Sequence, residues 1–173
     1  NLINQRFDIK PTKDLSLYAA GSYSYKLTDR PNSRTDITGG SDYDMRSEGW
    51  RWEAGAKYKI GKHSLLFDFV NDNYHYGNLY QVDTKNYKIG DFVRNKFQKY
   101  YEAELKGVFH FYSKATTIFG IDWRNDFLTA TSGDVNNNVY TFAGYAQHDM
   151  EIVKNLSATL GVRYTKHGTF GNN

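Results

Sequence analysis

The chain has 173 residues and a formal net charge of +3, from 22 basic and 19 acidic side chains. This balance is too even to indicate a protein that binds nucleic acid. Cysteine is absent and no apolar run approaches the length of a membrane helix, so disulfides, thiolate zinc sites and helical membrane spans are all excluded.

Apolar and polar residues alternate along almost the whole chain. The alternation starts in a fragment around Phe7 and Ile9 and continues through 15–28. It is clearest at 50–60, where the even positions from Trp50 to Ile60 are apolar or small and the odd positions are mostly charged. A strand has this period of two and a helix does not. Five more strands of the same kind are predicted, at 65–76, 97–111, 115–128, 139–152 and 156–167. With the fragment around Phe7 and Ile9 and the strands at 15–28 and 50–60, eight strands are predicted in all.

Charge separates the two faces of these predicted strands. The apolar face carries only Lys99 and Lys166, and both lie near strand ends that lead to long connections. There the cost of a basic residue, roughly 2 to 4 kcal/mol at the bilayer midplane, falls towards zero. Aromatic residues make up 17% of the chain although its mean hydropathy is −0.72, and either a water-soluble domain or strands between lipid and water could produce these averages. The residues expected to face lipid are Trp50, Trp52, Phe67, Phe69, Phe109, Phe119, Trp123 and Phe142.

The connections between the predicted strands alternate in length. The short ones are 10–14, 61–64, 112–114 and 153–155, and the long ones are 29–47, 77–95 and 129–138. Outer-membrane barrels have short periplasmic turns and long external loops, so this alternation is typical of them. The predicted fold is therefore all-β, an antiparallel up-and-down transmembrane β-barrel.

In two predicted hairpins, one register places apolar side chains opposite each other on one face and oppositely charged side chains opposite each other on the other face. If Phe111 faces Ala115, Glu102 lies opposite Arg124. If Ile60 faces Leu65, Lys57 lies opposite Asp68. Opposite charges at directly facing positions favour such pairing, so we predict both registers.

The parity of the connections predicts internal hairpins of a larger barrel. With the turn at 10–14 in the periplasm, both chain ends lie outside the cell, whereas a complete bacterial barrel normally begins and ends in the periplasm. The chain also starts at Asn1 without a signal segment. We therefore expect 1–173 to be a single region of a barrel domain, without its closing strands.

The C-terminal part of the chain resembles a known family. Phe142-Ala-Gly-Tyr-Ala-Gln147 precedes a predicted turn, which is followed by Leu160-Gly-Val-Arg-Tyr164 and Phe170-Gly171. These motifs resemble the Tyr-Ala-Gln and Leu-Gly-x-Arg-Tyr strand pair of TonB-dependent receptors. The resemblance implies a plugged barrel of about 22 strands in the bacterial outer membrane, of which this chain supplies about eight. It also implies active uptake of a scarce extracellular ligand such as a siderophore, haem, cobalamin or a glycan, with membrane lipid, a plug domain and TonB as partners.

Catalytic and metal-binding motifs are not apparent. The five histidines lack metal-ligand spacing, and acids such as Asp36, Asp42 and Asp44 lack the spacing of a calcium loop, so we expect them to be solvated. No nucleophile or phosphate-binding motif is present, and we expect neither enzymatic activity nor a cofactor.

The long connections offer cations and aromatic rings to an extracellular ligand, as exposed loops on rigid scaffolds commonly do. The candidate contact residues are Arg30, Arg34, Tyr43, Arg46, Tyr74, Tyr76, Tyr80 and Tyr87. The alternative interpretation is a small outer-membrane or soluble β-barrel that binds a partner, as an adhesin does, without transport.

Overall fold

The computed structural model describes residues 1–29, 43–131, 135–168 and 171–172. These residues form one antiparallel sheet of nine strands, paired in chain order from β1 to β9. The strands are β1 (Leu2–Ile9), β2 (Leu15–Thr28), β3 (Tyr43–Ile60), β4 (His63–Tyr80), β5 (Phe92–Tyr112), β6 (Ala115–Ala130), β7 (Val135–Val153), β8 (Leu156–His167) and β9 (Gly171–Asn172). The prediction of an all-β, up-and-down antiparallel fold is confirmed.

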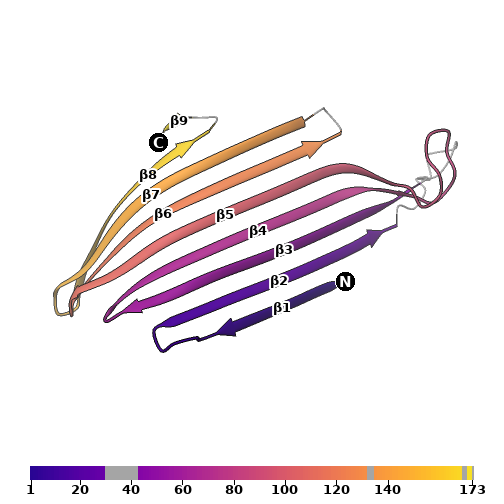
Figure 1. Cartoon of the computed structure of the whole chain (residues 1–173). Coiled ribbons are helices and arrows are strands. Elements are labelled where there is room, and N and C mark those ends of the chain that lie inside the picture. Colours follow the sequence, from indigo (N-terminus) through magenta and orange to yellow (C-terminus); the bar gives the residue numbers. More distant parts are fainter. Residues whose placement is uncertain (30–42, 132–134, 169–170, 173) are drawn as a thin grey trace.

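Figure 1 shows a curved sheet with its short turns at one end, the turn end, and the connection between β4 and β5 at the other, the loop end. The sheet is open, because in the described part of the chain β1 pairs only with β2 and β9 only with β8. The ninth strand, which the alternation did not predict, is short and pairs with Lys166 and His167 of β8. Nowhere in the described residues does a helix reach the length and apolarity that crossing a membrane requires.

Most strands extend further towards the loop end than alternation predicted. β3 begins at Tyr43, β4 continues to Tyr80 and β5 has 21 residues. The predicted long loop at 129–138 is wrong, because β6 ends at Ala130 and β7 begins at Val135. Backbone hydrogen bonds form the ladder whatever the side chains are, so a strand can continue after its alternation stops.

One of the two predicted registers is confirmed over most of its length. Glu102 faces Arg124, but a bulge after Phe109 places Tyr112, in place of Phe111, opposite Ala115. The other register is wrong: Ile60 faces His63, so Lys57 lies opposite Leu66. The chain reverses at Gly61, whose φ of 60° is readily adopted by glycine. Since the displacement is two positions, every side chain keeps its predicted face.

The sheet is a single layer with two unlike faces. The apolar face carries Trp52, Phe67, Leu105 and Ile121, and the polar face carries Glu53, Asp68, Glu104 and Asp122 on the same four strands. Trp52 is 47% exposed and Phe119 50% exposed, and Ala143 is the only buried hydrophobic residue among those described. The large apolar side chains therefore do not form the interior of a globule.

Candidate functional site on the polar face

Two tyrosines on the polar face donate hydrogen bonds to neighbouring carboxylates. The Tyr18 hydroxyl on β2 donates to Asp68 Oδ1 on β4 at 2.7 Å, and the Tyr145 hydroxyl on β7 donates to Glu104 Oε1 on β5 at 2.6 Å. Asp68 and Glu104 face each other across the β4–β5 pair. Both tyrosines lie on the polar face, and they reach the central strands from the two opposite edges of the sheet.

Each tyrosine ring crosses an intervening strand at a glycine. A Cβ atom on Gly55 of β3 would lie 2.3 Å from Cε1 of Tyr18, and one on Gly120 of β6 would lie 2.2 Å from Cζ of Tyr145. No side chain fits at either position while the ring is there. The absence of a Cβ atom thus opens the path from each hydroxyl to its carboxylate.

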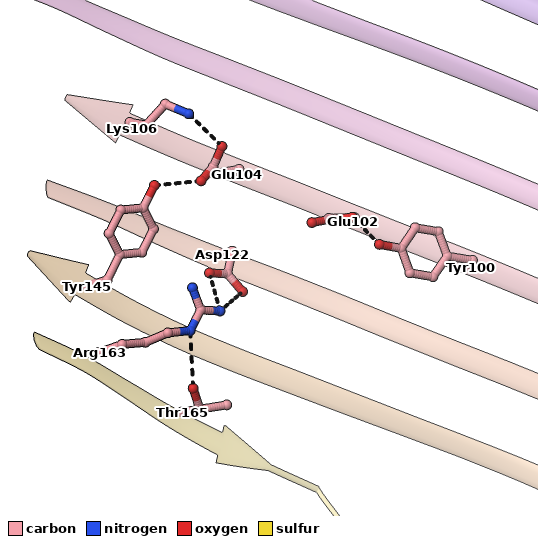
Figure 2. A network of polar contacts seen from close by, with 8 residues as sticks. All are labelled: Tyr100, Glu102, Glu104, Lys106, Asp122, Tyr145, Arg163 and Thr165. Carbon is pink, nitrogen blue, oxygen red and sulfur yellow. Dashed lines mark hydrogen bonds and ion pairs between the residues drawn. The ribbon is translucent and has the colours of Figure 1, made fainter. Parts of the chain in front are cut away.

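Arginines flank the two tyrosines on their outer sides. The Arg6 guanidinium lies 4.3 Å from the Tyr18 ring centroid, and that of Arg163 lies 5.7 Å from the Tyr145 ring centroid. Arg163 also donates to both oxygens of Asp122, at 2.8 and 3.1 Å. Figure 2 shows this arrangement on β5 to β8, with Lys106 donating to Glu104. The row from Arg6 to Arg163 spans eight strands.

A second polar cluster lies nearer the loop end of the same face. Arg51 pairs with Glu53 at 3.3 Å and with Asp72 at 3.7 Å, and Arg124 pairs with Asp126 at 2.7 Å. The members of this cluster line a hollow of about 520 Å³: Arg51, Asp72, Tyr74, Gln98, Tyr100, Arg124 and Asp126. Tyr100 donates a hydrogen bond to Glu102 beside it. The polar face therefore presents compensated charges and hydrogen-bonding groups.

The predicted ligand-contact residues that the structure describes divide into three groups. Tyr43, Tyr80 and Tyr87 form an aromatic cluster at the loop end, with ring centroids 5.7 Å apart for Tyr43 and Tyr80 and 4.5 Å for Tyr80 and Tyr87. Tyr74 and Tyr76 lie further along β4 on its polar face. Arg30 and Arg34 lie outside the described residues.

Arg46 is the third case, because it lies on the apolar face of β3 and pairs with Glu48. The prediction that Tyr43, Arg46 and Tyr80 lie in long connections is wrong, because they lie within β3 and β4. These strands continue beyond their alternating segments and carry the three side chains with them. Tyr74 and Tyr76 lie in the part of β4 that alternation predicts as strand, and Tyr87 lies in the 81–91 connection.

Sequence reasoning missed the tyrosines over glycines. Tyr18 faces Gly55 and Tyr145 faces Gly120 as cross-strand partners. A tyrosine that faces a glycine on the polar side of the neighbouring strand could be recognised in the sequence, but only if the register of the two strands were known.

In the described part of the chain, no three His, Asp or Glu side chains gather as metal ligands. Asp44, one of the acids considered for calcium, accepts a hydrogen bond from Gln81 at 2.9 Å.

A single curved sheet with an exposed apolar face and an opposite charged face is typical of the wall of an outer-membrane β-barrel. The model of the family "TonB dependent receptor-like, beta-barrel" matches residues 2–173, and the chain therefore belongs to this family of the bacterial outer membrane. This confirms the resemblance carried by 142–171. No curated protein sequence matches the chain.

Solved structures of outer-membrane proteins are similar to the chain in fold. The in-vitro folded OmpT of Vibrio cholerae has a TM-score of 0.60 and 13% identity, and the match covers 96% of this chain and 45% of that one. Its loop L8 deletion mutant has a TM-score of 0.62 and 14% identity, with 99% and 50% covered. The chain thus spans about half the length of these structures, and the likeness shows the fold alone.

Proposed function

We propose that these strands are part of the wall of a TonB-dependent receptor that actively takes up a scarce ligand across the outer membrane. The ligand classes are those that the family resemblance implies: a siderophore, haem, cobalamin or a glycan. The observation that carries the proposal is the family match over 2–173 on a sheet with two opposite environments. The full barrel has about 22 strands, of which residues 1–173 form one continuous region.

The apolar face contacts lipid in this proposal. The register places all eight predicted lipid-facing residues on this face, and Trp52, Phe67, Phe119 and Phe142 are each more than two-fifths exposed. Ring contacts such as Trp52 with Phe69 and Phe109 with Phe119 continue between strands. Hydrocarbon is the solvent in which so much exposed aromatic surface is stable.

The polar face contacts the plug domain and the aqueous lumen. The plug domain can form hydrogen bonds with this face, both along the row from Arg6 to Arg163 and at the hollow beside Arg51. We propose that this wall has no enzymatic role. The central carboxylates, Asp68 and Glu104, are each hydrogen-bonded by a tyrosine and support the sheet.

The aromatic cluster Tyr43–Tyr80–Tyr87 is the surface that we assign to the extracellular ligand. It lies at the loop end, and hydrogen bonds order the 81–91 connection beneath it, such as Thr84 N to Tyr87 O at 2.7 Å and Gly90 N to Tyr80 O at 2.8 Å. An ordered aromatic surface can stack on a planar or sugar ligand with little loss of side-chain entropy.

Uptake by cells tests the proposal. Bacteria that express the full-length protein are compared with isogenic cells that lack TonB, using labelled members of the four ligand classes. We expect one class to accumulate only when both proteins are present. Binding to cells without accumulation of any class, or accumulation that does not need TonB, contradicts the transport proposal and favours the adhesin-like alternative.

A further inference from the structure

The apolar face changes character abruptly towards the loop end. On β4, Leu65, Phe67 and Phe69 are followed on the same face by Asn71, Asn73 and His75. Asn71 and Asn73 are only 3% and 4% exposed, and Asn73 donates to Asn71 Oδ1 at 2.5 Å while Asn71 donates to Tyr100 O at 3.2 Å. This polar belt continues on β5, where Lys99 faces Asn73. The belt therefore begins where the apolar band ends.

An aromatic stack runs across the polar belt. His75 lies between Trp50 and Phe97, with ring centroids 4.7 and 4.5 Å away. Phe97 in turn has cations on two sides: Arg94 lies 5.4 Å and the Lys99 ammonium 5.1 Å from its ring centroid. Both cations therefore contact the same aromatic ring.

These two cations lack acidic partners. The ion pairs within 4.0 Å in the described residues do not include Arg94 or Lys99. Arg46, the third cation of the belt, pairs with Glu48 and lies 4.9 Å from the Phe92 ring centroid. Among the described residues, the belt thus carries two positive charges without an ion-pair partner, next to the apolar band.

A hollow lies beside Arg94 and Phe97. It has a volume of about 350 Å³ and is lined by residues of β5, β6 and β7, including Arg94, Phe97, Thr129 and Asn136. Guanidinium, hydroxyl and amide groups are the donors that proteins use for phosphate. With the apolar band in hydrocarbon, as proposed above, this hollow lies beyond the end of the band, at the level of the outer-leaflet headgroups.

We propose that Arg94 and Lys99, with the hollow beside Phe97, bind the phosphorylated headgroup of a lipid of the outer leaflet. The proposal rests on the lipid contact proposed above for the apolar face. Charge complementarity selects this occupant, because two unpaired cations beside hydrocarbon favour an anionic group attached to acyl chains. In this proposal the acyl chains lie along the apolar band from Phe69 to Phe67, and the phosphorylated headgroup contacts Arg94 and Lys99 at the hollow.

The test is a titration of the full-length protein in detergent, followed by native mass spectrometry. The probes are lipid A, which carries two phosphates, and its fully dephosphorylated counterpart. The wild type is expected to bind lipid A at least about 10-fold more tightly than the counterpart. R94Q/K99Q should lose this preference, whereas the charge-conserving R94K/K99R should keep most of it.

The matched control removes the same charge from the opposite face. Lys57 and Lys59 are exposed on the polar face of β3, and K57Q/K59Q should keep the full preference for lipid A. Heat-dependent gel mobility confirms that each variant is folded. Millimolar inorganic phosphate is expected not to compete, because the acyl chains supply part of the affinity.

Each contrary result has a distinct meaning. Equal binding of lipid A by R94Q/K99Q and the wild type, or no phosphate preference in the wild type, overturns the headgroup site while leaving the lipid-facing assignment intact. Effective competition by inorganic phosphate also overturns it, in favour of a soluble anion. Failure of the wild type to retain either lipid contradicts the lipid contact itself, and uptake by cells remains an independent test of transport.

Discussion

At the scale of single residues, the polar face depends on two glycines as much as on the polar side chains around them. Tyr18 and Tyr145 reach carboxylates two strands away only because glycine occupies the strand between. The ring also covers backbone that would otherwise be bare, which compensates for the low strand propensity of glycine. The two glycines are therefore expected to be more sensitive to substitution than glycines such as Gly144, where an added Cβ atom would meet nothing closer than 4.0 Å.

Gly120→Ala should destabilise the protein. The added methyl group would lie 2.2 Å from the Tyr145 ring, so the ring must leave its place and the hydrogen bond to Glu104 is lost. We expect a decrease of about 1 to 3 kcal/mol in the free energy of unfolding, measured with urea in lipid vesicles. Gly144→Ala is the control, because its nearest neighbours lie 4.0 Å away and it should change stability by less than about 0.5 kcal/mol. Equal effects of the two substitutions would contradict this assignment.

Tyr145→Phe separates the hydrogen bond from the ring. The phenyl ring still covers Gly120, but the 2.6 Å contact with Glu104 is lost. The expected cost is about 1 to 2 kcal/mol in the same unfolding experiment. Tyr164→Phe is the control and should be nearly neutral, because Tyr164 lies on the apolar face of β8 and takes no part in the polar network on the other face. A neutral Tyr145→Phe would mean that the ring alone stabilises the sheet.

At the scale of a strand, each element passes from apolar to polar surroundings along its length. β5 carries Leu105 in the apolar band and Lys99 in the polar belt, and β6 carries Ile121 and then Asn125 on the same face. This gradient explains why strands continue beyond the segments in which alternation is visible. Polar side chains on both faces are acceptable once the strand has left the hydrocarbon.

A pair of lysine substitutions tests this gradient. Leu105→Lys places a charge in the middle of the apolar band, where Leu105 is 46% exposed, and should cost about 2 to 4 kcal/mol of unfolding free energy in vesicles. Asn125→Lys places the same charge in the polar belt and should cost about 0 to 1 kcal/mol. If both cost the same, the apolar band does not lie in hydrocarbon.

At the scale of the whole molecule, the sheet formed by the described residues has neither a closed circumference nor a second layer. All eight residues of β1 are exposed, as is most of β8, and no other described part of the chain covers the apolar face. Unpaired strand edges and a continuous apolar surface both promote association. The sheet therefore needs further strands at its edges and lipid on its apolar face.

The isolated chain of 173 residues should consequently aggregate in water and disperse in detergent. Size-exclusion chromatography with light scattering, carried out with and without detergent micelles, measures this directly. Detergent covers the apolar face but leaves the edges free, so small oligomers are expected in micelles. A monodisperse monomer in detergent-free buffer would contradict the single-layer architecture.

The sequence by itself determined which residues share a face, because alternation is local and each strand has to match the solvent on its two sides. It therefore predicted the strands, the all-β class and the side of nearly every charge. Only the tertiary structure decided the β3–β4 register, the true strand ends and the contacts of Tyr18 and Tyr145 over their glycines. These depend on which residues of distant segments lie opposite each other, and a displacement of two positions leaves the alternation unchanged while replacing every cross-strand partner.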